Sequence, residues 1–490
     1  MSNYRSYGDL VKPKSKSGNL LRIFVVILCI IVVGFFGKNI LKWAQFVGAQ
    51  IGKWAITVVS NSLGTEMKKD EMGNVNIMII GYGGQGHAWS SLADSIMVAS
   101  WNPKLWAVTM ISVPRDLYVV TSGTHIKGRI NEVFAVGMWR KQQFETGAKY
   151  MEEQLEAIMG LQIDYYALID FQWFEGLIDS LGGIDVMVDK PIFDPTYPSS
   201  EKNIMTFKLG SGMQHLDGKT ALMFARSRHS TSDFDRSLRQ QKIVKAVMAE
   251  LTKKSNLFSP SKLKNLYGEY IKMVKTNISL DEIIGMWKYA YDLKHIFSFG
   301  YTTDCSNAAR KFSYPACFLI APPRELFDGA AVMIPVGPSN DPSFYDYTKK
   351  FAFYVTHNQK YLIEKANIVI QNGIDKKYAK QIQRKPDGHA NAIASKLKKY
   401  AFNVINVENT LVQPGGAKQI LTGTTIFIVG TGEYDQTIET LKNFIPIDTV
   451  VKPELGTGEK MSATTGTDLV LVLGNSYLDR TEAGQFSYYK

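Results

Sequence analysis

The sequence is poor in cysteine and histidine, and this scarcity restricts the chemistry available to the chain. Three cysteines and seven histidines occur among 490 residues. Cys29 lies in an apolar N-terminal stretch, which leaves Cys305 and Cys317 either to form a short-loop disulfide or to remain as two buried thiols. Neither has histidine partners at metal-site spacing, which argues against a zinc site. No Ser/His/Asp or Cys/His set suggests a nucleophilic centre.

The composition also lacks the bias of a disordered or fibrous protein. It is 45% hydrophobic, 12% aromatic and 21% charged, as in globular proteins, and the length allows two or three folded domains. Acidic residues are outnumbered, with 45 Asp and Glu against 56 Lys and Arg and a net charge of +11. A basic balance favours anionic partners. Phosphate, a membrane surface and nucleic acid all qualify, and charge alone does not choose among them.

The N-terminus contains an uncharged apolar run, IFVVILCIIVVGFFG, over residues 23–37. With its flanks it reaches a spanning length, so we predict a transmembrane anchor at 21–41. A cleaved signal peptide is the alternative, but the run is long and no A-x-A site follows it. The basic residues before position 23 outnumber the one acidic residue, Asp9, and they are Arg5, Lys12, Lys14, Lys16 and Arg22.

This charge asymmetry predicts the topology of the chain. By the positive-inside rule, residues 1–20 form a cytoplasmic basic tail and the bulk of the chain lies outside the cell membrane. Nucleic acid is therefore not an expected partner, whereas membrane lipid is. Residues 42–73 have helical spacing and are predicted to form a juxtamembrane helix or linker, with a lipid-contacting surface helix as the alternative.

From residue 74 onward, strand and helix patterns alternate. Apolar runs of strand type cover 74–81, 95–100, 105–112, 163–169 and 184–188, and helical patterns cover 146–159 and 171–181. Alternation of this kind predicts a layered α/β domain.

Two arginine-bearing segments carry the candidate chemistry. One is SVPRD at 112–116, at a predicted strand end, and the other is ARSRHSTSDFDRSLRQQ at 225–241. Guanidinium groups bind phosphate oxygens in a bidentate manner, so several on one pocket would suit a pyrophosphate. The interspersed carboxylates are able to hold a divalent metal or act as a base. The alternative is a solvated loop whose arginines and aspartates pair with one another.

Taken in order, the motifs of this region resemble the LytR-CpsA-Psr family of cell-wall glycopolymer transferases. Each motif is weak alone, but their common order is specific, and the resemblance covers residues 74–350. The matching segments are NIMIIG (76–81), ADSIMV (93–98), ISVPRDLY (111–118), RINE (129–132), DSLGGIDV (179–186), LDGKTAL (216–222), ARSR (225–228), DFDRSLRQQ (233–241) and TNISL (276–280).

The resemblance implies a central mixed sheet flanked by helices and a pocket for a polyprenyl pyrophosphate. It also implies a phosphotransferase that moves a polyprenyl-pyrophosphate-linked glycopolymer, such as teichoic acid or capsule, onto peptidoglycan with the help of Mg²⁺ or Mn²⁺. Asp94, Arg115 and Asp233 would be catalytic, and Asp94 and Asp233 would hold the metal. By position, the pyrophosphate ligands would be Arg115, Arg226, Arg228, Arg236 and Gln240.

One position departs from the family pattern. Relatives usually carry an arginine two places before the aspartate, where this chain has Leu92. A phosphate ligand is thus missing or is replaced by His87, Lys127 or Arg129. Two alternative functions therefore stay open. The same groups would serve a polyprenyl-pyrophosphate hydrolase, and the loss at Leu92 would suit a non-catalytic envelope attachment or regulatory protein.

The remaining sequence predicts a second, smaller domain. After a linker at 351–365, strand and helix patterns recur over 366–475 and resemble the LytR-type C-terminal domain. They contain no set of residues that suggests catalysis, so we expect this domain to bind the cell wall or to act as a spacer in it. Residues 476–490 are predicted to be a frayed tail.

Overall fold

The computed structural model describes most of the chain from residue 65 onward. The predicted cytoplasmic tail (1–20) and anchor (21–41), and the predicted linker up to residue 64, lie outside the described residues. Within the portion that the structure describes, no helix combines the length and apolarity needed to cross a membrane. The described ranges are 65–84, 91–120, 127–141, 143–198, 203–227, 233–251, 275–279, 282, 294–303, 317–408, 422–452 and 466–482.

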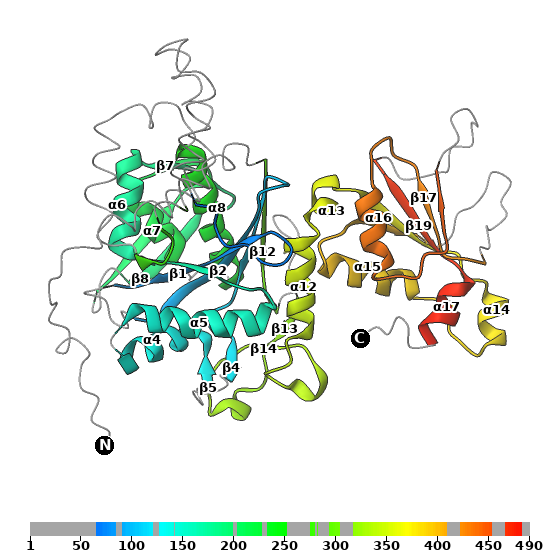
Figure 1. Ribbon diagram of the computed structural model, residues 1–490, viewed down its shortest axis with the longest axis horizontal. Coiled ribbons are helices and arrows are strands. Elements are labelled where there is room, and N and C mark those ends of the chain that lie inside the picture. Colours follow the sequence, from blue (N-terminus) through cyan, green and yellow to red (C-terminus); the bar gives the residue numbers. More distant parts are fainter. Residues whose placement is uncertain are drawn as a thin grey trace, which may run out of the picture.

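A six-stranded mixed sheet forms the centre of the first domain (Figure 1). Its strands are β1 (Val75–Tyr82), β2 (Ala93–Asn102), β3 (Ala107–Ser112), β6 (Tyr165–Asp170), β11 (Lys275–Thr276) and β12 (His295–Gly300). They lie in the order β11-β6-β1-β2-β3-β12, with β1 parallel to β6, β3 parallel to β12 and the other neighbours antiparallel. The predicted α/β fold with a central mixed sheet is confirmed.

Helices cover both faces of this sheet, because β1 is apolar on both sides. Met78 and Ile80 belong to the buried cluster beneath α4 (Ile130–Lys141) and α5 (Phe144–Met159). Ile77 points to the opposite face, where Val244 packs from the second layer of helices (Figure 1). Near-continuous apolar strands are what two-sided burial requires. That second layer contains α6 (Phe171–Leu181), α7 (Gly218–Arg226) and α8 (Asp233–Leu251).

Local capping signals fix several element ends as predicted. α6 covers 171–181, the predicted range, because Asp170 accepts a hydrogen bond from the Trp173 backbone N–H at its start. Gly182 and Gly183, both with positive φ, end the helix.

Four small two-stranded sheets accompany the central sheet in the first domain. They are formed by β4 (Tyr118–Val120) with β5 (Lys127–Arg129), β7 (Ile184–Val188) with β10 (Gly212–Leu216), β8 (Ile192–Pro198) with β9 (Ile204–Leu209), and β13 (Leu319–Ile320) with β14 (Ile334–Pro335).

The C-terminal domain contains a five-stranded sheet in the order β16-β15-β19-β17-β18. Its helices lie beside that sheet on the right of Figure 1. The strands are β15 (Asn367–Asn372), β16 (Asn403–Glu408), β17 (Thr425–Ile428), β18 (Thr449–Val451) and β19 (Leu469–Leu473). The helices are α14 (Lys376–Gln381), α15 (His389–Lys399), α16 (Asp435–Lys442) and α17 (Asn475–Glu482).

Two segments differ from their predictions. Residues 351–365, predicted as a linker, complete α12 (Asp346–His357) and form α13 (Gln359–Glu364), because Phe351 and Val355 bury one helical face. The tail begins with α17, whose Tyr477 and Leu478 are buried. Both segments pack through apolar residues whose partners are brought near only when the chain folds.

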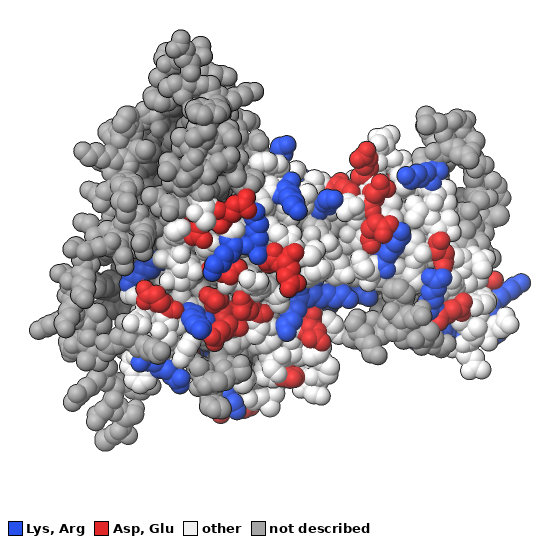
Figure 2. Space-filling view, viewed as in Figure 1, with Lys and Arg blue, Asp and Glu red and all other residues white. Residues whose placement is uncertain are grey.

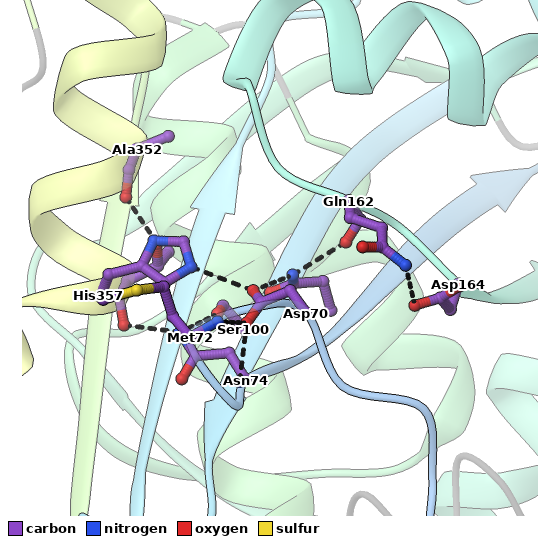
Figure 3. A network of polar contacts seen from close by, with 10 residues as sticks. Asp70, Met72, Asn74, Ser100, Gln162, Asp164, Ala352 and His357 are labelled. Carbon is purple, nitrogen blue, oxygen red and sulfur yellow. Dashed lines mark hydrogen bonds and ion pairs between the residues drawn. The ribbon is translucent and has the colours of Figure 1, made fainter.

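A buried polar network ties α12 to the start of the first domain (Figure 3). Asp70 accepts hydrogen bonds from the backbone of Asn74 and the side chain of Asn76, and its Oδ2 lies 3.0 Å from His357 Nε2. Both the Asp70 and His357 side chains are less than a tenth exposed. Burial alone would raise the pKa of Asp70, but the hydrogen bonds from His357, Asn74 and Asn76 outweigh it and lower that pKa.

Candidate active site

An open cavity lies where β2, the end of β3 and α8 meet. Three sequence-distant segments build it, since Asp94 is near the start of β2, Arg115 follows β3, and Arg236 and Gln240 lie one turn apart on α8. Residues four apart share one helix face, so these α8 side chains point the same way. The lining residues are Asp94, Ser95, Ile96, Val113, Pro114, Arg115, Arg236, Ser237, Gln240, Tyr301, Thr302 and Met333.

A chain of alternating charges begins inside the cavity. Asp94 Oδ1 accepts a hydrogen bond from Arg115 Nη1 at 2.6 Å. Asp116 lies behind, with its Oδ2 3.6 Å from Arg115 Nε and its Oδ1 3.8 Å from Arg129 Nη1. The Asp94 side chain is 42% exposed and that of Asp116 only 18%. Asp94 thus offers oxygen to a ligand, while Asp116 holds the two arginines from the protein side.

α8 is fixed on the sheet by the glutamine next to Gln240. Gln241 is buried and donates from Nε2 to Ser112 Oγ at 3.0 Å and to the Phe299 carbonyl at 2.8 Å. These bonds join α8 to the ends of β3 and β12. The rotation of α8 is therefore set, and Arg236 and Gln240 face the cavity.

Arg226 lies at the end of α7, between aromatic rings. Its guanidinium carbon is 4.3 Å from the centroid of Phe171 and 5.6 Å from that of Tyr197, and Nη1 donates to the Tyr197 hydroxyl at 3.2 Å. Arginine over aromatic faces is a favourable cation–π arrangement. Arg226 is not among the described residues that line the cavity.

A second arginine of the 225–241 segment, for which no site role was predicted, supports the end of α7. Arg239 is buried and donates to the carbonyls of Phe224, at 2.9 Å, and Ser227. Burial lowers the pKa of Arg239, and the nearby carboxylates of Asp235 and Asp194 act in the opposite sense. Asp194 also accepts a hydrogen bond from Ser227 Oγ at 2.8 Å. The end of α7, which presents Arg226, is thus held from two sides.

The predicted site residues fall into three groups. Asp94, Arg115, Arg236 and Gln240 are brought together in the cavity, and Arg226 lies in its own aromatic cluster. Arg228 and the side chain of Asp233 lie outside the described residues.

The surroundings of the site include residues that the sequence analysis passed over. Ser95 follows Asp94 directly in the ADSIMV motif, so its position next to the aspartate was the available signal. Tyr301 and Thr302 follow β12 and had no local signal. Burial raises the pKa of the Tyr301 hydroxyl, which donates to the Thr348 carbonyl at 2.8 Å. Of the proposed replacements for the missing arginine at Leu92, Arg129 pairs with Asp116, and His87 is outside the described residues.

The cavity offers limited ligands for a divalent metal. In the described part of the chain, no group of three His, Cys, Asp or Glu side chains is placed to hold a metal ion. Asp94 is the carboxylate among the lining residues. Mg²⁺ is commonly held by one or two carboxylates together with substrate phosphate oxygens and water. This donor set therefore fits Mg²⁺ if a phosphorylated substrate completes the coordination.

The charges on the described surface do not form one broad basic field on the face shown in Figure 2, where Lys, Arg, Asp and Glu side chains are interspersed. Together, these features define a mixed α/β domain with a cavity at the ends of β2 and β3, whose lining of two arginines, a glutamine and one carboxylate has the chemistry to contact an anion.

Comparison with known proteins identifies the family. Residues 53–306 match the model of the LytR_cpsA_psr family, and the chain belongs to this family. It is 28% identical over 235 residues to the polyisoprenyl-teichoic acid–peptidoglycan teichoic acid transferase TagU of Bacillus cereus, covering 46% of this chain and 68% of that protein. It is 32% identical over 222 residues to TagV of Bacillus subtilis, a transferase of the same name, covering 44% and 52%.

Solved structures also match the chain. The crystal structure of Bacillus subtilis TagV covers 59% of this chain and 98% of its own, with 23% sequence identity and a TM-score of 0.43. The structure of TagT bound to LIIa-WTA covers 58% and 92%, with 21% identity and a TM-score of 0.39.

Proposed function

We propose that this chain is a phosphotransferase that moves a polyprenyl-pyrophosphate-linked glycopolymer onto peptidoglycan. TagU and TagV are named for the transfer of teichoic acid from a polyisoprenyl carrier to peptidoglycan, and this chain resembles them over its first domain. The observation that carries the proposal is the meeting of Arg115, Arg236 and Gln240 with one carboxylate in a single cavity.

The cavity suits a pyrophosphate chemically. Two guanidinium groups and an amide supply donors to phosphate oxygens, and the guanidinium groups stay charged at any relevant pH. In the proposed step, an acceptor hydroxyl oxygen bonds to the glycan-bearing phosphorus and releases its proton to water. The bond from that phosphorus to the bridging oxygen breaks, and polyprenyl phosphate leaves. Arg115 and Arg236 would neutralise the charge that develops on the bridging and leaving oxygens.

A bound Mg²⁺ would neutralise further negative charge on the pyrophosphate. Asp94 would hold it through the oxygen that does not accept the bond from Arg115, and Asp233 is the second candidate ligand. Arg226 and Arg228 would contact the substrate farther from Asp94, where the end of α7 is held by Arg239. Asp116 would keep Arg115 directed at the cavity.

The location of this reaction follows from the N-terminal sequence. We infer an uncleaved anchor at residues 21–41, a cytoplasmic N-terminus and a catalytic domain outside the membrane, next to both the lipid-linked donor and the wall. The C-terminal domain would bind a component of the cell wall or hold the catalytic domain at a set distance within it.

The test is turnover of a short-chain polyprenyl-pyrophosphate glycan by the full-length chain in detergent, with peptidoglycan oligomers as acceptor. Transfer is expected with Mg²⁺ and is expected to stop with EDTA. Arg115→Ala should lower kcat/KM about 10²- to 10³-fold, as loss of a transition-state donor does. The matched control is Arg140→Ala, which removes an exposed arginine from α4 and should leave kcat/KM unchanged.

The products separate the proposed reaction from its alternative. Polyprenyl phosphate and glycan-bearing peptidoglycan in equal amounts support transfer. Release of the glycan phosphate without attachment to peptidoglycan would identify a hydrolase instead. If Arg115→Ala and Arg140→Ala have equal activity, the cavity is not the site of the transfer reaction.

A further inference from the structure

We propose that Ser95 is a positioning residue, whose hydroxyl orients the Gln240 amide so that its nitrogen faces the substrate pyrophosphate. The inference rests on the proposed function and adds to it a residue that acts through another. Ser95 and Gln240 are 145 positions apart in the chain, yet both line the cavity.

The hydrogen bond between the two residues has a definite direction. Ser95 Oγ donates to Gln240 Oε1 at 2.9 Å. An amide carries one acceptor atom and one donor atom, so fixing the oxygen fixes the nitrogen on the other side. Gln240 Nε2 makes no hydrogen bond to any part of the chain that the structure describes. Its two N–H groups are therefore available to a ligand in the cavity.

Without this bond, the Gln240 side chain would no longer be held at the cavity. A hydroxyl is able both to donate and to accept, so Ser95 holds the amide in place, and an anionic ligand selects the orientation in which Nε2 faces it. An alanine leaves Oε1 without this donor and frees the rotamers of the glutamine side chain. The expected loss is that of one hydrogen bond to an uncharged group, plus the conformational entropy of a side chain that the ligand must then order.

The position of the Ser95 side chain is itself tightly set. Ser95 pairs with Gly81 across the antiparallel β1–β2 ladder. A Cβ atom on Gly81 would lie 3.1 Å from Ser95 Cβ, which is closer than ordinary contact. The glycine opposite thus leaves room for Ser95, while Gln241 fixes α8 on its other flank. Strand and helix are therefore both fixed where the serine meets the glutamine.

The experiment is a double-mutant cycle in the full-length enzyme, with binding of a short-chain polyprenyl pyrophosphate and transfer kinetics as readouts. Ser95→Ala is expected to raise the Kd for the lipid and to lower kcat/KM about five- to tenfold. The same substitution in a Gln240→Ala background should have no further effect, because Ser95 acts through Gln240. Ser95→Thr keeps the hydroxyl and should restore most of the binding.

A matched control excludes a general effect on β2. Ser100→Ala removes a buried serine hydroxyl from the same strand, where Ser100 Oγ accepts a weak bond from Asn74 Nδ2 at 3.4 Å, away from the cavity. It should leave Kd unchanged. Equal Kd values for Ser95→Ala and Ser100→Ala, or additive losses in Ser95→Ala and Gln240→Ala, would overturn the inference. If the wild-type chain binds no polyprenyl pyrophosphate, the proposed function itself fails.

Discussion

Asp70 accepts four hydrogen bonds at the edge of the first domain, and its replacement by alanine should destabilise that domain strongly. Oδ1 accepts from the backbone N–H groups of Met72, at 3.0 Å, and Asn74, at 2.9 Å. Oδ2 accepts from Asn76 Nδ2 at 2.8 Å and from His357 Nε2 at 3.0 Å (Figure 3). A hydrogen bond to a charged group contributes about 1.5–3 kcal/mol, so losing the carboxylate and its bonds together costs about 3–5 kcal/mol. We expect the free energy of unfolding to fall by an amount in that range. The loss should not exceed it, because Asn76 Nδ2 keeps its hydrogen bond to the Gln162 carbonyl.

His357 joins this network through both of its ring nitrogens. Nδ1 lies 3.0 Å from Thr356 Oγ1, which also donates to the Ala352 carbonyl at 2.7 Å. Nε2 faces the Asp70 carboxylate and donates to it. Alanine at position 70 would therefore leave the buried Nε2–H group without its acceptor.

The assay is urea unfolding followed by tryptophan fluorescence. All eight tryptophans precede residue 288, and Trp101, Trp106, Trp139 and Trp173 lie in the described part of the first domain, so the signal reports on that domain and not on the C-terminal one. Asp164→Ala is the matched control, because it removes an exposed bond from Gln162 and should change the free energy of unfolding by less than about 0.5 kcal/mol.

The stability difference between wild type and Asp70→Ala should also depend on pH. The pKa of Asp70 is lowered in the folded state, so its stabilising contribution is complete above the ordinary carboxylate pKa of about 3.9 and is lost as the pH falls through the lowered value. Wild type and Asp70→Ala should therefore differ most at neutral pH and converge only below about pH 4. A difference under 1 kcal/mol at pH 7, or one that persists unchanged at pH 3, would refute the reasoning.

Two further predictions follow from packing and from burial. Gly218→Ala should cost about 1–3 kcal/mol in thermal unfolding, since its Cβ would lie 2.2 Å from the Glu175 carbonyl oxygen between α6 and α7. Gly210→Ala is the control, because its Cβ would make only an ordinary contact, 3.6 Å from Gln214 Nε2, and an equal cost for the two variants would contradict this. Burial lowers the pKa of Lys275 to about 8, with Glu145 and Asp170 acting in the opposite sense. Competitive acetylation read by mass spectrometry should therefore show the Lys275 amine titrating near pH 8, and a midpoint near the ordinary 10.4 would count against its burial.

The elements with strong local signals were predictable from sequence. The helix at 171–181 and the strand at 184–188 have the predicted bounds, because a capping aspartate and a pair of glycines determine these ends within a few residues. β11 and β12 were missed, since a two-residue strand and a strand without clear alternation become strands only through pairing with β6 and β3. The same limit applies to α12, whose apolar face is defined by both domains.

The candidate site divides in the same way. The sequence by itself determined the residue types, because arginines, a carboxylate and a glutamine in motif order are enough to predict an anion site and the family. Only the tertiary structure decided which of them meet. Asp94, Arg115 and Gln240 come together through the order of β2 and β3 and the placement of α8, whereas Arg226 turns to Phe171 and Tyr197. Sheet order and helix rotation depend on contacts between distant residues, such as Ser95 with Gln240, and such contacts exist only after the chain has folded.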